Sequence, residues 1–367
     1  MSEALRDLAY LAACAVSGTP AEGGRVDRMD LDAVFALASA HRLSAVAAMA
    51  LADAGRRDSR SGMIIARAER RAILFDHEWV GVRLALEAAG IRHMPLKGAV
   101  LKDLYPKLGM REFVDYDILI DPARAAEVRA IMEARGFDTE SYGIEQHDVY
   151  VKAPIIRFEI HRVLFAEWGM ARLYDYYRDV GGRLVADGRS GFGCRFTPED
   201  FYLYMIAHEY KHYESGGTGL RSLLDTYVYL KACALDMDYV RKEAEKLGLA
   251  AFESRNRALA AALFEGGDVT DPEMLEVMLA SGASGTYERY VGRQLSGSGK
   301  AAYLRKRLFG PSGGPEKAHF REQYARFYRF PLLLPFLPAY RAVRALAVHP
   351  RQLWNEIKAL VRAKKGS

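Results

Sequence analysis

The chain has 367 residues, of which 50% are hydrophobic and 27% are charged, and its formal net charge is +5 at pH 7. This composition is that of an ordinary globular protein and excludes a disordered chain, and the length is enough for two or three domains. The three cysteines are too few and too far apart for a disulfide framework or a zinc site. We therefore expect a reducing, cytoplasmic environment.

Residues 1–90 are predicted to form an N-terminal helical region that carries no export signal. Glu3 and Asp7 stand where a signal peptide carries positive charge. Ala and Leu recur at helical spacing in residues 29–55, and Asp30 or Asp32 is placed to cap that helix. A second long helix is expected over residues 63–89.

The hydrophobic period changes in residues 91–165. The run IRHMPL predicts a short strand, KGAVLKDLYPKL a helix and FVDYDILID an alternating strand. The segment PARAAEVRAIMEARGF predicts a helix, and three strand-like pieces follow it. These 75 or so residues predict a small α/β unit.

Residues 166–310 are predicted to form a second helical region, opened by a capping box at Thr197. His208 and His212 lie four residues apart without a metalloprotease pattern, so we favour a structural or acceptor-pocket role over zinc binding. Arg221 and Asp225 have the same spacing and predict an ion pair within one helix.

The last region, residues 311–367, is basic. From Lys300 to Ser367 there are 15 Lys or Arg and three Glu, a balance of +12. Such a region suits a nucleic acid, an anionic membrane surface or a helix packed on its own protein. We favour packing for residues 330–346, whose three prolines and large apolar residues are poorly placed in water. The most apolar run, residues 330–340, is far shorter than the roughly 20 residues of a transmembrane helix.

The candidate chemistry centres on two carboxylates. Asp115 and Asp117 are two apart on a predicted strand, so their side chains point to the same face and repel each other unless a cation joins them. Carboxylate oxygens suit Mg²⁺ or Mn²⁺. Glu159 lies on a later predicted strand and would complete a two-metal site. Upstream, Lys97 and Gly98 lie at a strand-to-helix turn, where a backbone can approach a phosphate.

The block LKG, the run R-x3-DYDILI and the strand FEIH together resemble the DNA polymerase β-like nucleotidyltransferase superfamily. More narrowly, residues 30–231 are similar to a bacterial family of uncharacterised nucleotidyltransferases. The resemblance implies an α+β fold in which a small mixed-sheet core is flanked by N-terminal and C-terminal helical regions. One position departs from the superfamily pattern: Ala99 follows Gly98, where a Gly or Ser is usual.

The resemblance also implies roles for single residues. Asp115, Asp117 and Glu159 would be catalytic and would hold Mg²⁺ or Mn²⁺, with Glu159 also helping to deprotonate the acceptor hydroxyl. Gly98 would let the turn close on the nucleotide phosphates, and Lys97 and Arg111 would neutralise the leaving pyrophosphate. The NTP and the acceptor, a small molecule, protein or RNA, are not specified.

Two other functions fit the same residues. A non-catalytic nucleotide-binding or regulatory module would keep the fold without turnover. A glycosyltransferase with a DxD motif is disfavoured, because no large doubly wound domain precedes Asp115.

Overall fold

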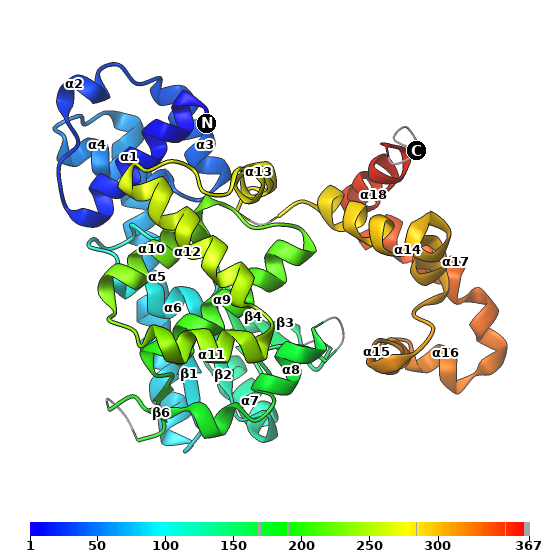
Figure 1. Cartoon of the computed structure of the whole chain (residues 1–367). Coiled ribbons are helices and arrows are strands. Elements are labelled where there is room, and N and C mark those ends of the chain that lie inside the picture. The colour runs from blue at the N-terminus through cyan, green and yellow to red at the C-terminus, as the bar shows by residue number, and fades with distance from the viewer. Residues whose placement is uncertain (145, 168–169, 189–190, 284, 349, 363–367) are drawn as a thin grey trace.

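The computed structural model describes residues 1–144, 146–167, 170–188, 191–283, 285–348 and 350–362. Five helices form the N-terminal part of the chain (Figure 1). They are α1 (Glu3–Ser17), α2 (Gly23–Val26), α3 (Leu31–Ala40), α4 (Ser44–Asp53) and the long α5 (Ser59–Ala88).

The single helix expected over residues 29–55 is two helices, α3 and α4. Asp30 caps α3 as predicted, because its carboxylate accepts a hydrogen bond from the Ala33 N–H at 3.0 Å. The break between the helices lies at Arg42, whose φ of 54° is left-handed. No glycine or proline marks this turn in the sequence.

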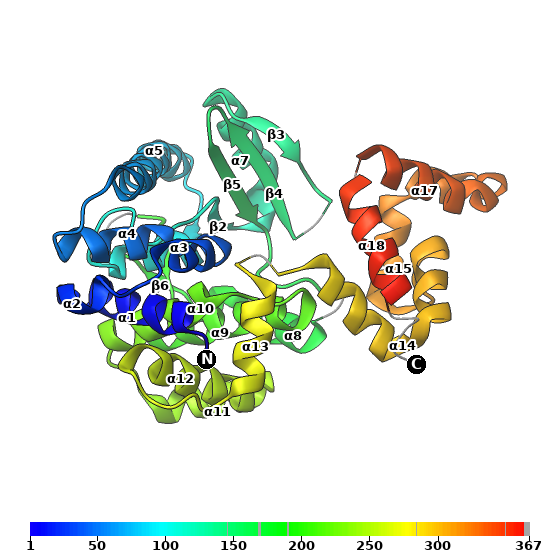
Figure 2. The ribbon, with the colours of Figure 1, turned by 90° about the horizontal axis from the view of Figure 1, so that it is seen from above.

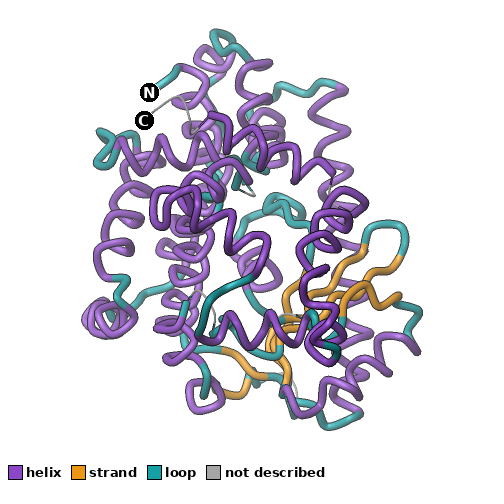
Figure 3. The backbone as a smooth tube through the Cα atoms, turned by 90° about the vertical axis from the view of Figure 1, so that its right-hand side faces the viewer, coloured by secondary structure: helices purple, strands orange, loops and turns teal. Residues whose placement is uncertain are grey.

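A five-stranded mixed sheet lies toward one side of the main body (Figures 2 and 3). Its strands are β1 (His93–Pro95), β2 (Tyr116–Ile120), β3 (Asp138–Ser141), β4 (His147–Lys152) and β5 (Ile156–His161). They lie in the order β1-β2-β5-β4-β3, with β2 parallel to β5 and the other neighbours antiparallel. The chain therefore has the α+β fold predicted from its sequence.

Alternation along β2 and β5 gives the sheet two different faces. Tyr116, Ile118, Phe158 and Ile160 are fully buried and pack in a core with α5 and with α7 (Ala125–Ala134). The side chains between them in the sequence point to the opposite face, toward the helices of the second helical region.

The helix predicted after β1 is shorter than expected. The helix α6 (Lys97–Leu101) continues only as the 3₁₀ turn η1 (Lys102–Leu104), and a second 3₁₀ turn, η2 (Pro122–Arg124), precedes α7. Pro106 accounts for the early end of α6, because a proline disfavours helical backbone at the residue before it.

The second helical region covers the polar face of the sheet. Its elements are α8 (Ala171–Tyr177), η3 (Val180–Arg183), β6 (Val185–Ala186), β7 (Cys194–Arg195), α9 (Pro198–Ser215), α10 (Leu220–Ala232), α11 (Met237–Leu247), α12 (Ala250–Glu265) and α13 (Pro272–Ser281). The side chain of Thr197 caps α9 by accepting from the Asp200 N–H. One large apolar core joins these helices to α1, α3 and α4.

The C-terminal helices lie beside the main body (Figures 1 and 2). They are α14 (Tyr287–Phe309), α15 (Gly314–Gln323), α16 (Ala325–Arg329), η4 (Pro331–Phe336), α17 (Leu337–Val348) and α18 (Pro350–Arg362). The prediction that residues 330–346 pack on the protein is wrong for most of this stretch. Leu332 is 88% exposed and Phe336 is 65% exposed, whereas Leu337 is buried. The division of the chain at residues 90, 165 and 310 stays a prediction.

Among the described residues, no helix combines the length and the apolar character that a membrane crossing requires.

Candidate active site

Two carboxylates lie side by side on the polar face of the sheet. Asp117 of β2 is directly opposite Glu159 of β5 in the parallel register. Their alternation with buried apolar neighbours directs both side chains away from the core and toward α9. Asp115, predicted within the strand, directly precedes β2. Asp117 and Glu159, which are far apart in the sequence, are therefore neighbours on two adjacent strands.

A cavity of about 320 Å³ opens over these carboxylates, between the sheet, α6, α9 and α10. All six residues predicted for the site line this cavity: Lys97, Gly98, Arg111, Asp115, Asp117 and Glu159. The structure therefore brings the predicted residues together, although they span 63 positions of the chain.

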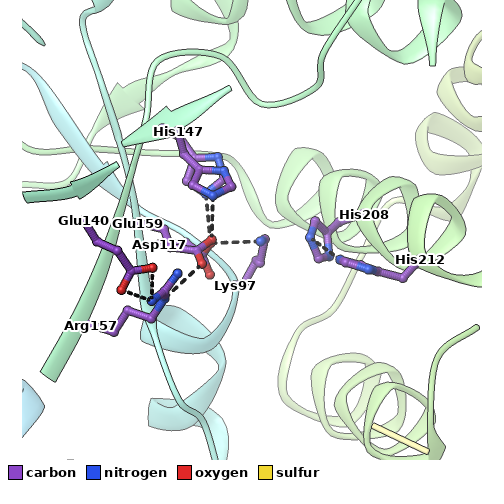
Figure 4. A network of polar contacts seen from close by, with 9 residues as sticks. Lys97, Asp117, Glu140, His147, Arg157, Glu159, His208 and His212 are labelled. Carbon is purple, nitrogen blue, oxygen red and sulfur yellow. Dashed lines mark hydrogen bonds and ion pairs between the residues drawn. The ribbon is translucent and has the colours of Figure 1, made fainter. Parts of the chain in front are cut away.

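Asp117 is held as an anion by two neighbours (Figure 4). It is 4% exposed, and one of its oxygens accepts hydrogen bonds from Lys97 Nζ at 2.9 Å and from His161 Nε2 at 2.8 Å. Burial acts to raise the pKa of this carboxyl, but the ammonium of Lys97 and the imidazole of His161 outweigh burial and hold the pKa well below its ordinary value. Lys97 reaches this position from a left-handed backbone conformation, with φ of 39°.

The other two carboxylates are less well compensated. Burial, followed by the negative charges of Asp117 and Asp115, raises the pKa of Glu159 to about 7. Burial and the charge of Asp117 likewise raise the pKa of Asp115. Burial and mutual repulsion thus disfavour the charged forms of Glu159 and Asp115, and a divalent cation would relieve that repulsion.

A histidine that the sequence analysis did not select completes this cluster. His147 of β4 is paired with His161 of β5 in the antiparallel register, and their ring centroids are 5.0 Å apart. Potential ligand atoms of His147, Glu159 and His161 all lie within 4.8 Å of one another. The alternation of β4 and β5 around a tight hairpin is the signal that could have located His147.

This donor set fits a divalent metal ion. The carboxylates of Asp115, Asp117 and Glu159 suit Mg²⁺ or Mn²⁺, whereas the two imidazoles add nitrogen donors of the kind that transition metals accept. Within the described part of the chain, the buried Nδ1 atoms of His147 and His161 have no hydrogen-bond partner. Both rings therefore have unused polar capacity beside the carboxylates.

Arg111 lies in the cavity wall as half of a buried ion pair. Its Nε and Nη2 donate to the two carboxylate oxygens of Asp225 at 2.7 and 2.8 Å, and the hydroxyl of Tyr105 donates to the same carboxylate at 2.8 Å. The prediction that Asp225 pairs with Arg221 is wrong. Arg221 instead donates to the backbone carbonyl of Glu112 at 2.8 Å.

Gly98 makes room for Arg111. A Cβ atom at Gly98 would lie 2.7 Å from Nη1 of Arg111, closer than side-chain atoms tolerate. The glycine at this turn therefore has a packing reason of its own, in addition to the phosphate contact that the sequence suggested.

His208 and His212 face the same cavity from α9 (Figure 4). Their Nε2 atoms are 3.0 Å apart, so one ring donates to the other and the accepting ring is neutral. Among the described residues, no third His, Cys, Asp or Glu joins them at metal-ligand spacing. This arrangement places two imidazoles across the cavity from the carboxylates.

Comparisons with known proteins place the chain in a family. One solved structure that matches part of the chain is that of an antigenic nucleotidyltransferase-like protein from Paracoccidioides brasiliensis, with 15% identity and a TM-score of 0.34 over 52% of this chain and 93% of that one. No curated protein matches the sequence. A family model described as uncharacterised nucleotidyltransferase matches residues 27–265. The chain belongs to this family.

Proposed function

We propose that this member of the uncharacterised nucleotidyltransferase family transfers a nucleoside monophosphate from an NTP to an acceptor hydroxyl and releases pyrophosphate. The observation that carries the proposal is the convergence of Asp115, Asp117 and Glu159 from neighbouring strands on one cavity. Surface carboxylates repel one another and spread apart, whereas these three share a partly enclosed space.

Asp115, Asp117 and Glu159, which line one cavity, would hold Mg²⁺ or Mn²⁺. Among the described residues, the donor atoms at metal-ligand spacing are those of His147, Glu159 and His161, so Glu159 would link the two sets. When bound, the ions would neutralise phosphate charge and favour ionisation of the acceptor hydroxyl. His161 keeps Asp117 oriented through the 2.8 Å hydrogen bond. Lys97 lies against Asp117, and a phosphate entering the cavity would compete with this carboxylate for the ammonium.

In the reaction, the acceptor oxygen forms a bond to the α-phosphorus while the bond from that phosphorus to the β-phosphate oxygen breaks. The proton of the acceptor hydroxyl passes to Glu159 or to water, and pyrophosphate leaves with the electron pair of the broken bond. Glu159 suits this role because its carboxylate lies on the cavity beside Asp117, from the neighbouring strand. The cationic side chain of Lys97 would stabilise negative charge on the leaving group.

We place this reaction in the cytoplasm. The three cysteines, Cys14, Cys194 and Cys233, are free thiols, which suits a reducing compartment that also supplies NTPs.

A non-catalytic nucleotide-binding module is the second candidate. The cavity wall favours it in one respect: Arg111 is engaged with Asp225 on both carboxylate oxygens, so it is not available to a phosphate in this arrangement. Such a module would bind NTP and metal without releasing pyrophosphate.

The first prediction is that NTPs stabilise the protein only together with Mg²⁺ or Mn²⁺. The folded-state pKa of Glu159, about 7, is raised from an ordinary value of 4.5. The contribution of Glu159 to the free energy of unfolding is therefore fully present below pH 4.5 and is lost as the pH rises through 7. A bound cation needs the carboxylate form, so the stabilisation by metal should grow over the same range.

Thermal unfolding with each of the four NTPs, with and without metal, at pH 6 and pH 8, measures this effect. We expect a higher melting temperature with one or more NTPs plus metal, and a larger shift at pH 8. Equal shifts with and without metal would contradict the assignment of the three carboxylates.

A further inference from the structure

A second groove, of about 340 Å³, adjoins the catalytic cavity between α3, α5 and the segment that precedes β2. Arg42, Arg111, Phe113 and Val114 line both spaces, so the groove leads into the cavity. Most of the charged side chains that line the groove are arginines. The acidic side chain in its wall, Glu112, accepts a hydrogen bond from the Ala45 N–H.

One face of α5 supplies most of these arginines. Arg60, Arg67 and Arg71 lie at helical spacing along it, and the eleven helical steps from the first to the last cover about 16 Å. Arg60 forms an ion pair with Asp32 at 2.7 Å. In the described part of the chain, Arg67 and Arg71 have neither an ion pair nor a side-chain hydrogen bond.

We propose that this groove, formed by α3, α5 and the segment before β2, binds an acceptor that carries phosphate groups and directs its hydroxyl into the catalytic cavity. This inference rests on the proposed function, in which Asp115, Asp117 and Glu159 receive the NTP and metal. A row of cations about 16 Å long beside that cavity suits a second, linear anionic substrate. A single-stranded oligonucleotide with a free 3′-hydroxyl has this chemistry.

The test compares two variants with the same change of charge. Arg67→Glu with Arg71→Glu alters the groove, whereas Arg57→Glu with Arg70→Glu alters exposed arginines of the same part of the chain that do not line it. The probe is a fluorescein-labelled single-stranded RNA of eight nucleotides, followed by anisotropy at several salt concentrations. Tripolyphosphate serves as competitor. We expect the groove variant to bind at least about tenfold more weakly and the control variant to stay within about threefold of the wild type.

Each possible result of these binding measurements either supports or overturns the proposal. Binding that weakens with salt and is lost only in the groove variant supports the proposal. No binding by the wild type, or equal loss in both variants, overturns it. Loss of metal-dependent NTP stabilisation in the groove variant, with RNA binding unchanged, would assign the groove to the NTP instead and also overturn it. RNA binding by a wild type that no NTP stabilises would support the groove while contradicting the proposed function.

A different observation supports a separate inference about the C-terminal helices. Large apolar side chains are exposed from the residue after α16 through η4, α17 and α18, at fractions from 43 to 88%: Phe330, Leu332, Leu333, Phe336, Tyr340, Val343, Leu346, Trp354 and Ile357. On α17 they recur every three residues, with Arg344 exposed between them. Residues 325–362 contain seven Lys or Arg and one Glu, a charge balance of +6.

We propose that this apolar and cationic surface of α16–α18 and η4 docks on an anionic lipid bilayer. Exposed aromatic and aliphatic side chains enter the acyl boundary, and neighbouring arginines contact the headgroups. A nucleic acid would match the charge but not the apolar side chains. The helices that carry these side chains lie beside the main body (Figure 1).

Sedimentation of the full chain with vesicles tests this docking. We expect binding to vesicles of phosphatidylcholine with 30% phosphatidylglycerol, about tenfold weaker binding to phosphatidylcholine alone, and loss of binding in Leu332→Asp with Phe336→Asp. Met63→Asp with Ile73→Asp, exposed apolar positions on α5, is the matched control. No sedimentation of the wild type overturns the proposal. Self-association that disappears in the Leu332 and Phe336 variant, without vesicle binding, also overturns it and assigns the surface to a second copy.

Discussion

Replacing Asp117 with Asn should lower the rate of pyrophosphate release by about 10³-fold or more while the protein stays folded. Asp117 is the most deeply buried of the three carboxylates and accepts hydrogen bonds from Lys97 and His161. Asn keeps its shape but loses its charge, and charge stabilisation by a metal ion is worth several kcal/mol, with each 1.36 kcal/mol equal to about tenfold in rate. Pyrophosphate release with the stabilising NTP, metal and a cell extract that supplies acceptors measures the change.

Glu159→Gln separates the enzyme from a binding module. Because Glu159 is assigned to the acceptor proton, its variant should retain measurable NTP binding but lose turnover. Asp121→Asn and Glu140→Gln are matched controls. Asp121 directly follows β2, and Glu140 pairs with Arg157, which also lies beside Glu159, but neither Asp121 nor Glu140 lines the cavity. Pyrophosphate release unaffected by Asp117→Asn and Glu159→Gln would remove the catalytic assignment.

The sheet was predictable because its strands carry a local pattern. In FVDYDILID, apolar residues alternate with the two aspartates, and the structure buries Tyr116, Ile118 and Ile120 on one face while Asp117 takes the other. The end of α6 had a local signal in Pro106. The break between α3 and α4 had none, because Arg42 adopts its left-handed backbone without a glycine or proline nearby.

The site residues that share a sequence motif were predictable. The pairing of side chains that only the tertiary fold brings together was not. The resemblance placed Asp115, Asp117 and Glu159 together, and the structure brings them to one cavity. Spacing of four residues suggested that Asp225 pairs with Arg221, but Asp225 lies 114 positions from its partner, Arg111. A local pattern cannot report such a contact, because many arginines compete for each carboxylate and only the packed fold selects one.

The same principle explains the C-terminal error. Arg and Lys stems beside apolar residues suit a helix packed on its own protein as well as a helix on a membrane. The sequence carries the amphipathic pattern but not the identity of the surface that covers it. The exposure of Leu332 and Phe336 shows that the main body does not cover them.

Replacing Asp225 with Ala should lower the free energy of unfolding by about 3–5 kcal/mol. The side chain of Arg111 is 5% exposed, and its two short hydrogen bonds to Asp225 are its charge compensation. Removing the carboxylate leaves a buried guanidinium without a counter-charge and the Tyr105 hydroxyl without its acceptor. Urea unfolding of the full chain, followed by circular dichroism, measures the loss.

Two further variants distinguish a buried charge from a general loss of contacts. Glu133→Ala breaks the ion pair with Arg129. The two side chains are 46% and 43% exposed, so the free energy of unfolding should fall by less than about 1 kcal/mol. Asp225→Leu combined with Arg111→Met removes both buried charges and should recover much of the stability lost in Asp225→Ala, because an apolar pair of similar volume has no desolvation cost. If the double variant is no more stable than Asp225→Ala, the loss comes from packing around α10 and not from the uncompensated Arg111.

The recovered double variant would also show whether Arg111 contributes to NTP binding, since it restores the fold without restoring the guanidinium.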